Sequence, residues 1–85
     1  MTASVKARVF AAAAEAIGAH EVSLAGGTVA DVRAALGAIG LDAGRRDSVA
    51  VIRQCAILEA GVRREDDYVL AAGAQIDVMP PFAGG

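Results

Sequence analysis

The feature that most constrains the fold is one helix signal with strand signals on both sides of it. In the stretch TVADVRAALGAIG, Thr28 stands where a helix N-cap is expected, and Asp31 follows three residues later as in a capping box. Gly40 is expected to be the C-terminal cap. The apolar residues that recur at helical spacing are Val29, Val32, Leu36 and Ile39. This helix must lay its apolar stripe on another element, and we expect a sheet, since little else in the chain could cover it.

The part of the chain before this helix predicts two strands. Val5, Ala7 and Val9 alternate with basic residues, which is the period of a half-buried strand. An alanine-rich stretch at residues 11–18 indicates a short helix or turn. A second alternation at residues 21–24 then leads into a pair of glycines. We expect these first two strands to be neighbours in the sheet.

The part after the helix predicts a polar connection (41–48), an apolar run of ambiguous type (49–52) and a buried strand (55–58). A short strand is expected at residues 62–63, before a charged loop. Tyr68, Val69 and Leu70 are then expected to return to the core, and Ile76 and Val78 to belong to a last strand. Pro80 and Pro81 should end that strand, because proline cannot donate to a sheet ladder.

Strands grouped around one principal helix indicate an α+β fold, a single sheet covered on one face. All 85 residues are expected to form one domain, because neither a repeat nor a linker interrupts them. Hydrophobic residues make up 55% of the chain, but many of them are alanines that bury little area. We therefore expect ordinary or low stability and a benefit from a partner.

Composition excludes several classes of function. The net charge of −2 and the absence of a basic stripe disfavour nucleic-acid binding. Apolar runs stay well short of the roughly 18 residues of a membrane span, and no basic segment precedes VFAAAA as in a signal peptide. With a single cysteine and no export signal, the cytoplasm is the expected compartment.

The chain lacks the side chains that an independent enzyme needs. His20 is expected to be a solvated imidazole at a strand edge, and Cys55 a small buried thiol. Two such residues cannot supply a structural zinc site, so no metal is expected. The consecutive acids at residues 65–67 indicate a solvated turn, and the glycine pair before the helix lacks the spacing of a phosphate loop.

The chain ends in DVMPPFAGG, residues 77–85. One interpretation is an ordinary frayed terminus. The other is a chemical handle. Two glycines form a thin, flexible segment that can pass through a narrow channel. Gly85 would present an unhindered carboxylate, while Pro80 and Pro81 would hold the root of the tail extended.

The strand–strand–helix–strand–strand order followed by VMPPFAGG resembles the ubiquitin-like sulfur carriers. Its PPFAGG ending is most similar to the small subunit of molybdopterin synthase, the MoaD family, whereas the related ThiS carriers usually lack the proline pair. The resemblance also covers the strand that ends in Phe10, the TVADVRAAL helix and the LAAG turn. It implies a ubiquitin-like β-grasp: a mixed sheet packed against one main helix, with a flexible C-terminal diglycine tail at residues 80–85.

The resemblance implies a sulfur carrier for molybdenum cofactor biosynthesis that is not an enzyme on its own. Gly85 would be adenylated with ATP by a partner related to ubiquitin-activating enzymes. It would then be thiocarboxylated with sulfur from a donor such as a cysteine desulfurase or a rhodanese. The tail would enter the large subunit of molybdopterin synthase, in a heterotetramer, and donate sulfur to cyclic pyranopterin monophosphate. No cofactor would be bound permanently.

The same resemblance assigns roles to the rest of the tail. Gly84 would be the slim residue behind the sulfur-bearing Gly85, with Ala83 before it. Phe82, with Pro80 and Pro81, would form the rigid apolar root that docks at both partners.

Two departures from the family pattern concern turns. Ala74 follows Gly73 where an aspartate is common, and EAG at residues 59–61 replaces Asn-Gly or Asp-Gly. They leave open a related carrier for thiamin, cysteine or tRNA thiolation. Also open are a ubiquitin-like modifier joined to lysines of target proteins and a plain interaction domain.

Overall fold

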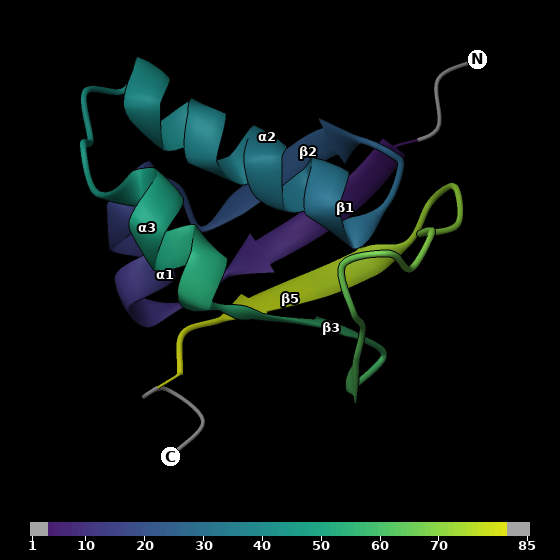
Figure 1. Cartoon of the computed structure of the whole chain (residues 1–85). Helices are drawn as coiled ribbons and strands as arrows, with labels where there is room; N and C mark the ends of the chain where they lie inside the picture. Colours follow the sequence, from purple (N-terminus) through teal and green to yellow (C-terminus); the bar gives the residue numbers. More distant parts are fainter. Residues whose placement is uncertain (1–3, 82–85) are drawn as a thin grey trace.

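The computed structural model describes residues 4–81. Its elements, in chain order, are β1 (Ser4–Val9), α1 (Ala11–Ile17), β2 (Glu21–Ala25), α2 (Val29–Asp42), α3 (Ser48–Gln54), β3 (Ala56–Glu59), β4 (Val62–Arg63) and β5 (Gln75–Met79). Figure 1 shows the helices gathered on one side of a twisted sheet. The predicted α+β class is confirmed.

The sheet is mixed and has the strand order β2-β1-β5-β3-β4. β1 is antiparallel to β2 and parallel to β5, while β3 is antiparallel to both β5 and β4. The first two strands are therefore neighbours as predicted, although α1 connects them. Ala7 lies opposite Val22 on one side and Ile76 on the other. The inward side chains of all three strands therefore face the same core.

The core lies between the helices and one face of the sheet. The expectation that one helix covers this face is incomplete, because α1 and α3 pack beside α2 and bury their own apolar residues. The buried hydrophobic residues are Val5, Ala7, Val9, Ala13, Ala14, Ile17, Leu24, Val29, Val32, Leu36, Ile52, Cys55, Ile57, Leu70, Ile76 and Val78. The other face of the sheet is not covered by a helix and carries polar side chains together with apolar ones near the end of β5. Among the helices of the described residues, none is long and apolar enough to cross a membrane.

Helix α2 begins as predicted but ends later. The Thr28 hydroxyl accepts from the Asp31 N–H, and the Asp31 carboxylate accepts from the Thr28 N–H, both at 3.1 Å. At the other end the helix continues to Asp42, so Gly40 is not its cap. Gly40 is buried instead, because α3 crosses the helix there and a side chain would meet Ser48.

The ambiguous run at residues 49–52 belongs to helix α3. The connection before it was predicted to be polar, but its last residue, Ser48, is fully buried. The Ser48 hydroxyl donates to the Gly37 carbonyl at 2.8 Å. Cys55, expected to start a strand, is the C-cap of α3, and β3 begins one residue later, at Ala56.

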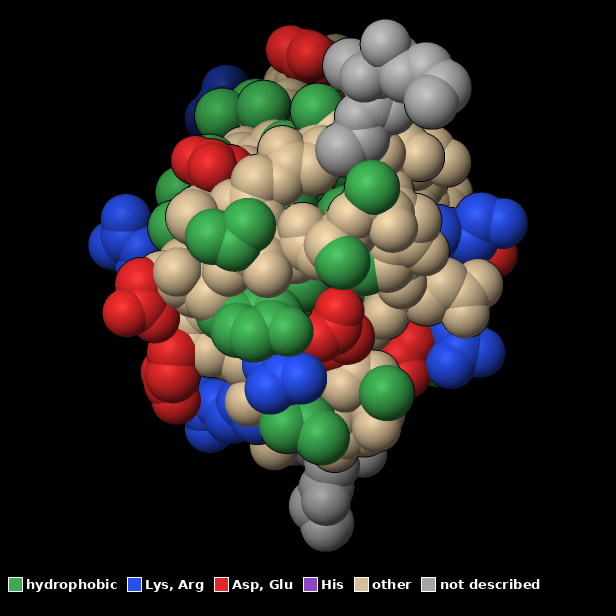
Figure 2. All heavy atoms as spheres, turned by 90° about the vertical axis from the view of Figure 1, so that its right-hand side faces the viewer, with side chains coloured by type: hydrophobic (Ala, Val, Ile, Leu, Met, Phe, Trp, Pro, Cys, Tyr) green, Lys and Arg blue, Asp and Glu red, His purple; other side chains and the backbone are tan. Residues whose placement is uncertain are grey.

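The segment between β4 and β5 folds over the start of α2. Leu70 is buried and Tyr68 is half-buried, as expected, but Val69 points outward and is 68% exposed. Val69 is instead bridged to Thr28 through the backbone. Figure 2 shows the side of the molecule on which this segment lies: apolar side chains gather in the middle and adjacent acidic and basic side chains surround them.

Candidate functional site at the root of the tail

The end of β5 holds the root of the C-terminal tail. Because β1 and β5 are parallel, both strands finish at the same edge of the sheet. The Phe10 N–H donates to the Val78 carbonyl at 3.2 Å, next to the point where the ladder stops. β5 ends at Met79, as the prolines predicted, and Pro80 is buried while Pro81 is exposed. The chain is therefore anchored in the sheet up to the first proline.

An apolar surface surrounds this root on the open face of the sheet. Phe10 follows β1 and is 36% exposed; it lies beside Met79 because Val9 pairs with Val78. On the other side of Met79 lies Ala56 of β3. We call Phe10, Ala56, Leu58, Met79 and Pro81 the tail-root surface.

The tail-root surface includes one wall of an open groove. The groove has a volume of about 450 Å³ and is lined by Gln54, Ala56, Leu58, Arg63, Met79, Pro80 and Pro81. Most of this lining is apolar, with the polar ends of Gln54 and Arg63 beside it. An incoming protein could bury apolar area in this groove.

A charged pair lies next to the tail-root surface. The Arg8 Nε donates to Asp77 Oδ1 at 2.8 Å, and Nη2 donates to Oδ2 at 3.1 Å, which is a bidentate contact between β1 and β5. The Arg8 guanidinium also lies 5.8 Å from the centre of the Phe10 ring. The hydrogen bond to Asp77, together with the negative charge of that carboxylate, raises the pKa of Arg8. The pair thus joins the two central strands close to their ends.

Sequence reasoning missed Arg8, Phe10 and Asp77 as parts of this site. In the sequence pattern each is only an outward or strand-end position. The signal that could have found them is the resemblance itself, because a β-grasp pairs its first strand with its last. The residues that should carry the chemistry, Phe82, Ala83, Gly84 and Gly85, lie outside the described residues, so their roles stay predictions.

The two reactive side chains that the sequence offered are not brought together. His20 is exposed just before β2, and its carbonyl accepts from the Val9 N–H at 2.8 Å. Cys55 is buried, and its thiol donates to the Val51 carbonyl at 3.2 Å. Burial raises the pKa of the Cys55 thiol, and the nearby Arg33 lowers it by less. A buried thiol with a raised pKa is a poor nucleophile.

The acidic loop and the glycine pair also serve the fold. The acids at 65–67 are exposed around the turn that the sequence predicted, and Asp66 forms an ion pair with Arg33 at 3.2 Å. The N–H groups of Val29 and Ala30 donate to the carbonyls of Tyr68 and Asp66 at 2.9 and 3.0 Å. These contacts occupy the helix end that a phosphate would need. Across residues 4–81, no three His, Cys, Asp or Glu side chains converge as metal ligands would.

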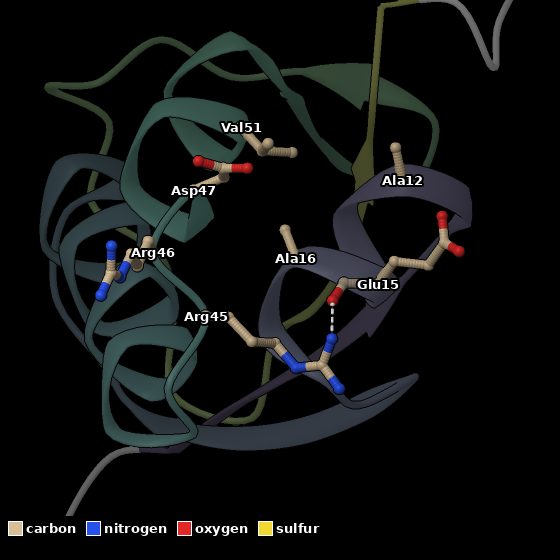
Figure 3. Close-up of a pocket in the computed structure, with 7 residues that line it drawn as sticks. All are labelled: Ala12, Glu15, Ala16, Arg45, Arg46, Asp47 and Val51. Carbon is tan, nitrogen blue, oxygen red and sulfur yellow. Dashed lines mark hydrogen bonds between the residues drawn. The ribbon is translucent and has the colours of Figure 1, made fainter.

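A second hollow lies between α1 and the α2–α3 connection (Figure 3). It has a volume of about 360 Å³ and is lined by Ala12, Glu15, Ala16, Arg45, Arg46, Asp47 and Val51. The Arg45 guanidinium is already engaged, because its Nη1 donates to the Glu15 carbonyl at 2.7 Å. The hollow combines charges of both signs without a nucleophile, so the tail root is the better candidate.

A mixed five-stranded sheet in this order, covered on one face by α1, α2 and α3, defines the ubiquitin-like β-grasp that the resemblance implied. The sequence pattern of the ThiS family matches residues 7–85, and the chain belongs to the ThiS family. No curated protein matches it significantly.

Solved structures agree with this assignment. The crystal structure of SAMP1 from Haloferax volcanii is 26% identical, with a TM-score of 0.72 over 96% of this chain and 99% of that one. The solution structure of small archaeal modifier protein 1 from Methanosarcina acetivorans is 26% identical, with a TM-score of 0.71 over 100% of this chain and 99% of the other.

A protein from Pyrococcus furiosus, provisionally assigned as molybdopterin converting factor subunit 1, has the same fold. It is 20% identical, with a TM-score of 0.73 over 94% of this chain and 99% of that one. The chain is accordingly a small carrier of the ThiS/MoaD kind or a modifier of the SAMP kind. Proteins of the ThiS/MoaD family are sulfur carriers that are not themselves catalysts.

Proposed function

We propose that the chain is the sulfur-carrying small subunit of a molybdopterin synthase. The observation that carries this proposal is the root of the tail: β5 ends at Met79, and Pro80 and Pro81 follow it beside the exposed or half-buried apolar side chains of the tail-root surface. A partner can hold such a root while the diglycine reaches further. The PPFAGG ending, which is most similar to the MoaD family, supports molybdenum cofactor biosynthesis over the other sulfur pathways.

The loading chemistry takes place at the last residue of the tail. The Gly85 carboxylate attacks the α-phosphorus of ATP in a partner related to ubiquitin-activating enzymes, forming an acyl adenylate and releasing pyrophosphate. The outer sulfur of a cysteine persulfide on a cysteine desulfurase or a rhodanese then attacks the acyl carbon and displaces AMP, which gives an acyl disulfide. A second thiol attacks the cysteine sulfur of this disulfide, forms a new disulfide with it, and releases the acyl sulfur. The product is a thiocarboxylate at Gly85.

The second partner would be the large subunit, which binds cyclic pyranopterin monophosphate. There the thiocarboxylate sulfur forms a bond to a pterin side-chain carbon while the C–O bond at that carbon breaks and its oxygen leaves. Water then hydrolyses the resulting thioester, which leaves the sulfur on the pterin and returns the Gly85 carboxylate. The folded part of the chain contributes position only. Gly84 and Ala83 are narrow enough to follow Gly85 into a channel, and Phe82, Pro80 and Pro81 provide the root that both partners hold.

A second candidate function is protein modification. It is favoured by the two structures at 26% identity, which are named as small archaeal modifier proteins. In this case a lysine Nζ of a target protein would attack the Gly85 adenylate, forming an isopeptide bond and releasing AMP. The two functions share activation and differ in the acceptor.

The test supplies each acceptor in turn. The chain would be incubated with its activating enzyme, ATP and a sulfur donor, then given the large subunit with cyclic pyranopterin monophosphate, and the pterin product analysed for sulfur. Dithiolene formation that requires Gly85, judged against a variant lacking that residue, supports the proposal. Isopeptide adducts in cell extract without any sulfur transfer would select the modifier instead.

A further inference from the structure

The Arg8–Asp77 pair belongs to a row of side chains that crosses the open face of the sheet. Strand register places Glu21 beside Arg8 and Leu58 beside Asp77. Arg63 completes the row, since it pairs with Leu58. The next row toward the strand ends is the apolar one, with Phe10, Met79 and Ala56. Charged and apolar rows therefore lie side by side.

A protein that takes the tail must cover both rows. Residues on the same face of a strand are about 7 Å apart along it, so Asp77 lies that close to Met79. A standard protein interface buries about 800 Å² on each partner, an area that extends well beyond one row. An interface centred on the tail-root surface thus removes water from the Arg8–Asp77 pair.

Removing this water leaves donors that the chain itself does not satisfy. The Arg8 side chain is 57% exposed and that of Asp77 is 29% exposed, so the guanidinium is the more accessible partner. Only Nε and Nη2 of Arg8 donate to Asp77. The remaining N–H groups must find acceptors on the incoming protein, because buried donors without a partner weaken binding.

The charge on this face differs from the charge of the whole chain. The outward residues include the cations Lys6, Arg8 and Arg63 and the anions Glu21 and Asp77, an excess of one positive charge on a chain whose net charge is −2. One of these cations, Arg8, has N–H groups that Asp77 does not engage, so the complementary group for it is a carboxylate.

We propose that the Arg8–Asp77 pair selects the protein that receives the tail, and that this partner places a carboxylate against Arg8. This inference rests on the proposed function, because it assumes a tail-receiving partner. The pair joins β1 to β5, and it also presents a fixed guanidinium fork beside the tail-root surface. A partner that has the apolar area but lacks the acidic group binds poorly, which is how such a contact gives specificity.

A charge swap separates this role from a purely structural one. The double variant R8D/D77R retains an ion pair between β1 and β5 but exchanges the two charges. A partner then meets an aspartate at position 8 and an arginine at position 77. It is made in an E21Q background, since Glu21 would repel an aspartate at position 8, and E21Q alone is the reference. Binding to the large subunit of molybdopterin synthase from the same source is measured by calorimetry.

We expect the swap to weaken binding at least about tenfold while the circular dichroism spectrum stays unchanged. The conservative variant R8K should give an intermediate loss, because it retains the charge but not the fork. Reference binding should also weaken with added salt more steeply than binding of the swapped chain. As a control, R46D/D47R makes the same kind of exchange in the α2–α3 connection, and should leave binding unchanged.

Equal binding by the swapped and reference chains would overturn the inference. It would also be overturned if the reference chain were a dimer that the swap dissociates without any effect on partner binding. These results are distinct from failure of the proposed function, which would appear as a wild-type chain that its activating enzyme never loads with sulfur. In that case the inference fails with it.

Discussion

Replacement of Gly40 by alanine tests the packing of α2 against α3. A Cβ at position 40 would lie 2.6 Å from the Ser48 Oγ and 2.7 Å from the Ala16 carbonyl oxygen, and it would overlap the Ser48 Cβ. The overlapped atoms belong to the start of α3 and to the backbone of α1, so relief requires the helices to separate. Such separation also weakens the buried hydrogen bond from Ser48 to the Gly37 carbonyl.

The expected net effect is a loss of about 2 kcal/mol in the free energy of unfolding. Alanine gains up to about 1 kcal/mol over glycine in a helix interior. Overpacking costs roughly 1–3 kcal/mol, and weakening the buried hydrogen bond of Ser48 costs about 1 kcal/mol more. For a domain of this size, a loss of about 2 kcal/mol lowers the melting temperature by roughly 10 °C.

Urea and thermal unfolding, followed by circular dichroism, measure this loss. The matched control is G37A, the same change one turn earlier, where the added Cβ would lie 3.1 Å from the movable Val49 Cγ2. We expect G37A to stay within about 1 kcal/mol of wild type. Introducing S48G together with G40A should recover part of the loss. A G40A protein as stable as wild type would refute the reasoning.

Two further predictions concern single side chains. R33M should lower the free energy of unfolding by about 2 kcal/mol, because the Arg33 Nη1 donates to the Ile52 and Cys55 carbonyls at 2.7 and 2.8 Å. The control is R53M, which makes the same change at a nearby exposed arginine. Equal urea midpoints for R33M and R53M would contradict this prediction. Burial raises the pKa of Cys55, so the folded state holds the thiol proton more tightly than the unfolded state. Stability is then unaffected by this group below the ordinary thiol pKa and falls as pH rises above it; C55A should lose less stability than wild type between neutral pH and about pH 10, and parallel curves would disprove the effect.

The sequence predicted those features of the fold that depend on contacts between residues close together in the chain. The start of α2 was predictable because Thr28 and Asp31 satisfy each other's N–H groups within one turn. Its end was not, because Gly40 fits the local rules for a cap, whereas its place inside the helix allows a close approach of α3 that only the tertiary fold reveals. The short run at 49–52 could not be assigned for a related reason: four apolar residues fit a strand or a helix until their packing partner is known.

In the candidate site, too, features set by neighbouring residues were predictable and contacts between distant residues were not. That β5 ends at Met79 follows from the chemistry of proline and was predicted directly. The Arg8–Asp77 pair joins residues 69 positions apart, and only the parallel pairing of β1 with β5 creates it. The apolar character of Val69 predicts a core position, but the backbone bridge to Thr28 turns it outward.

Intact-mass spectrometry of the chain after incubation with its activating enzyme, ATP and a sulfur donor tests sulfur carriage most directly. We expect a mass increase equal to the exchange of one oxygen for one sulfur, located by fragmentation at Gly85. A variant lacking Gly85 should fold with the same stability and show no such increase. An unchanged mass of the wild-type chain under conditions that load an established carrier would contradict the central claim.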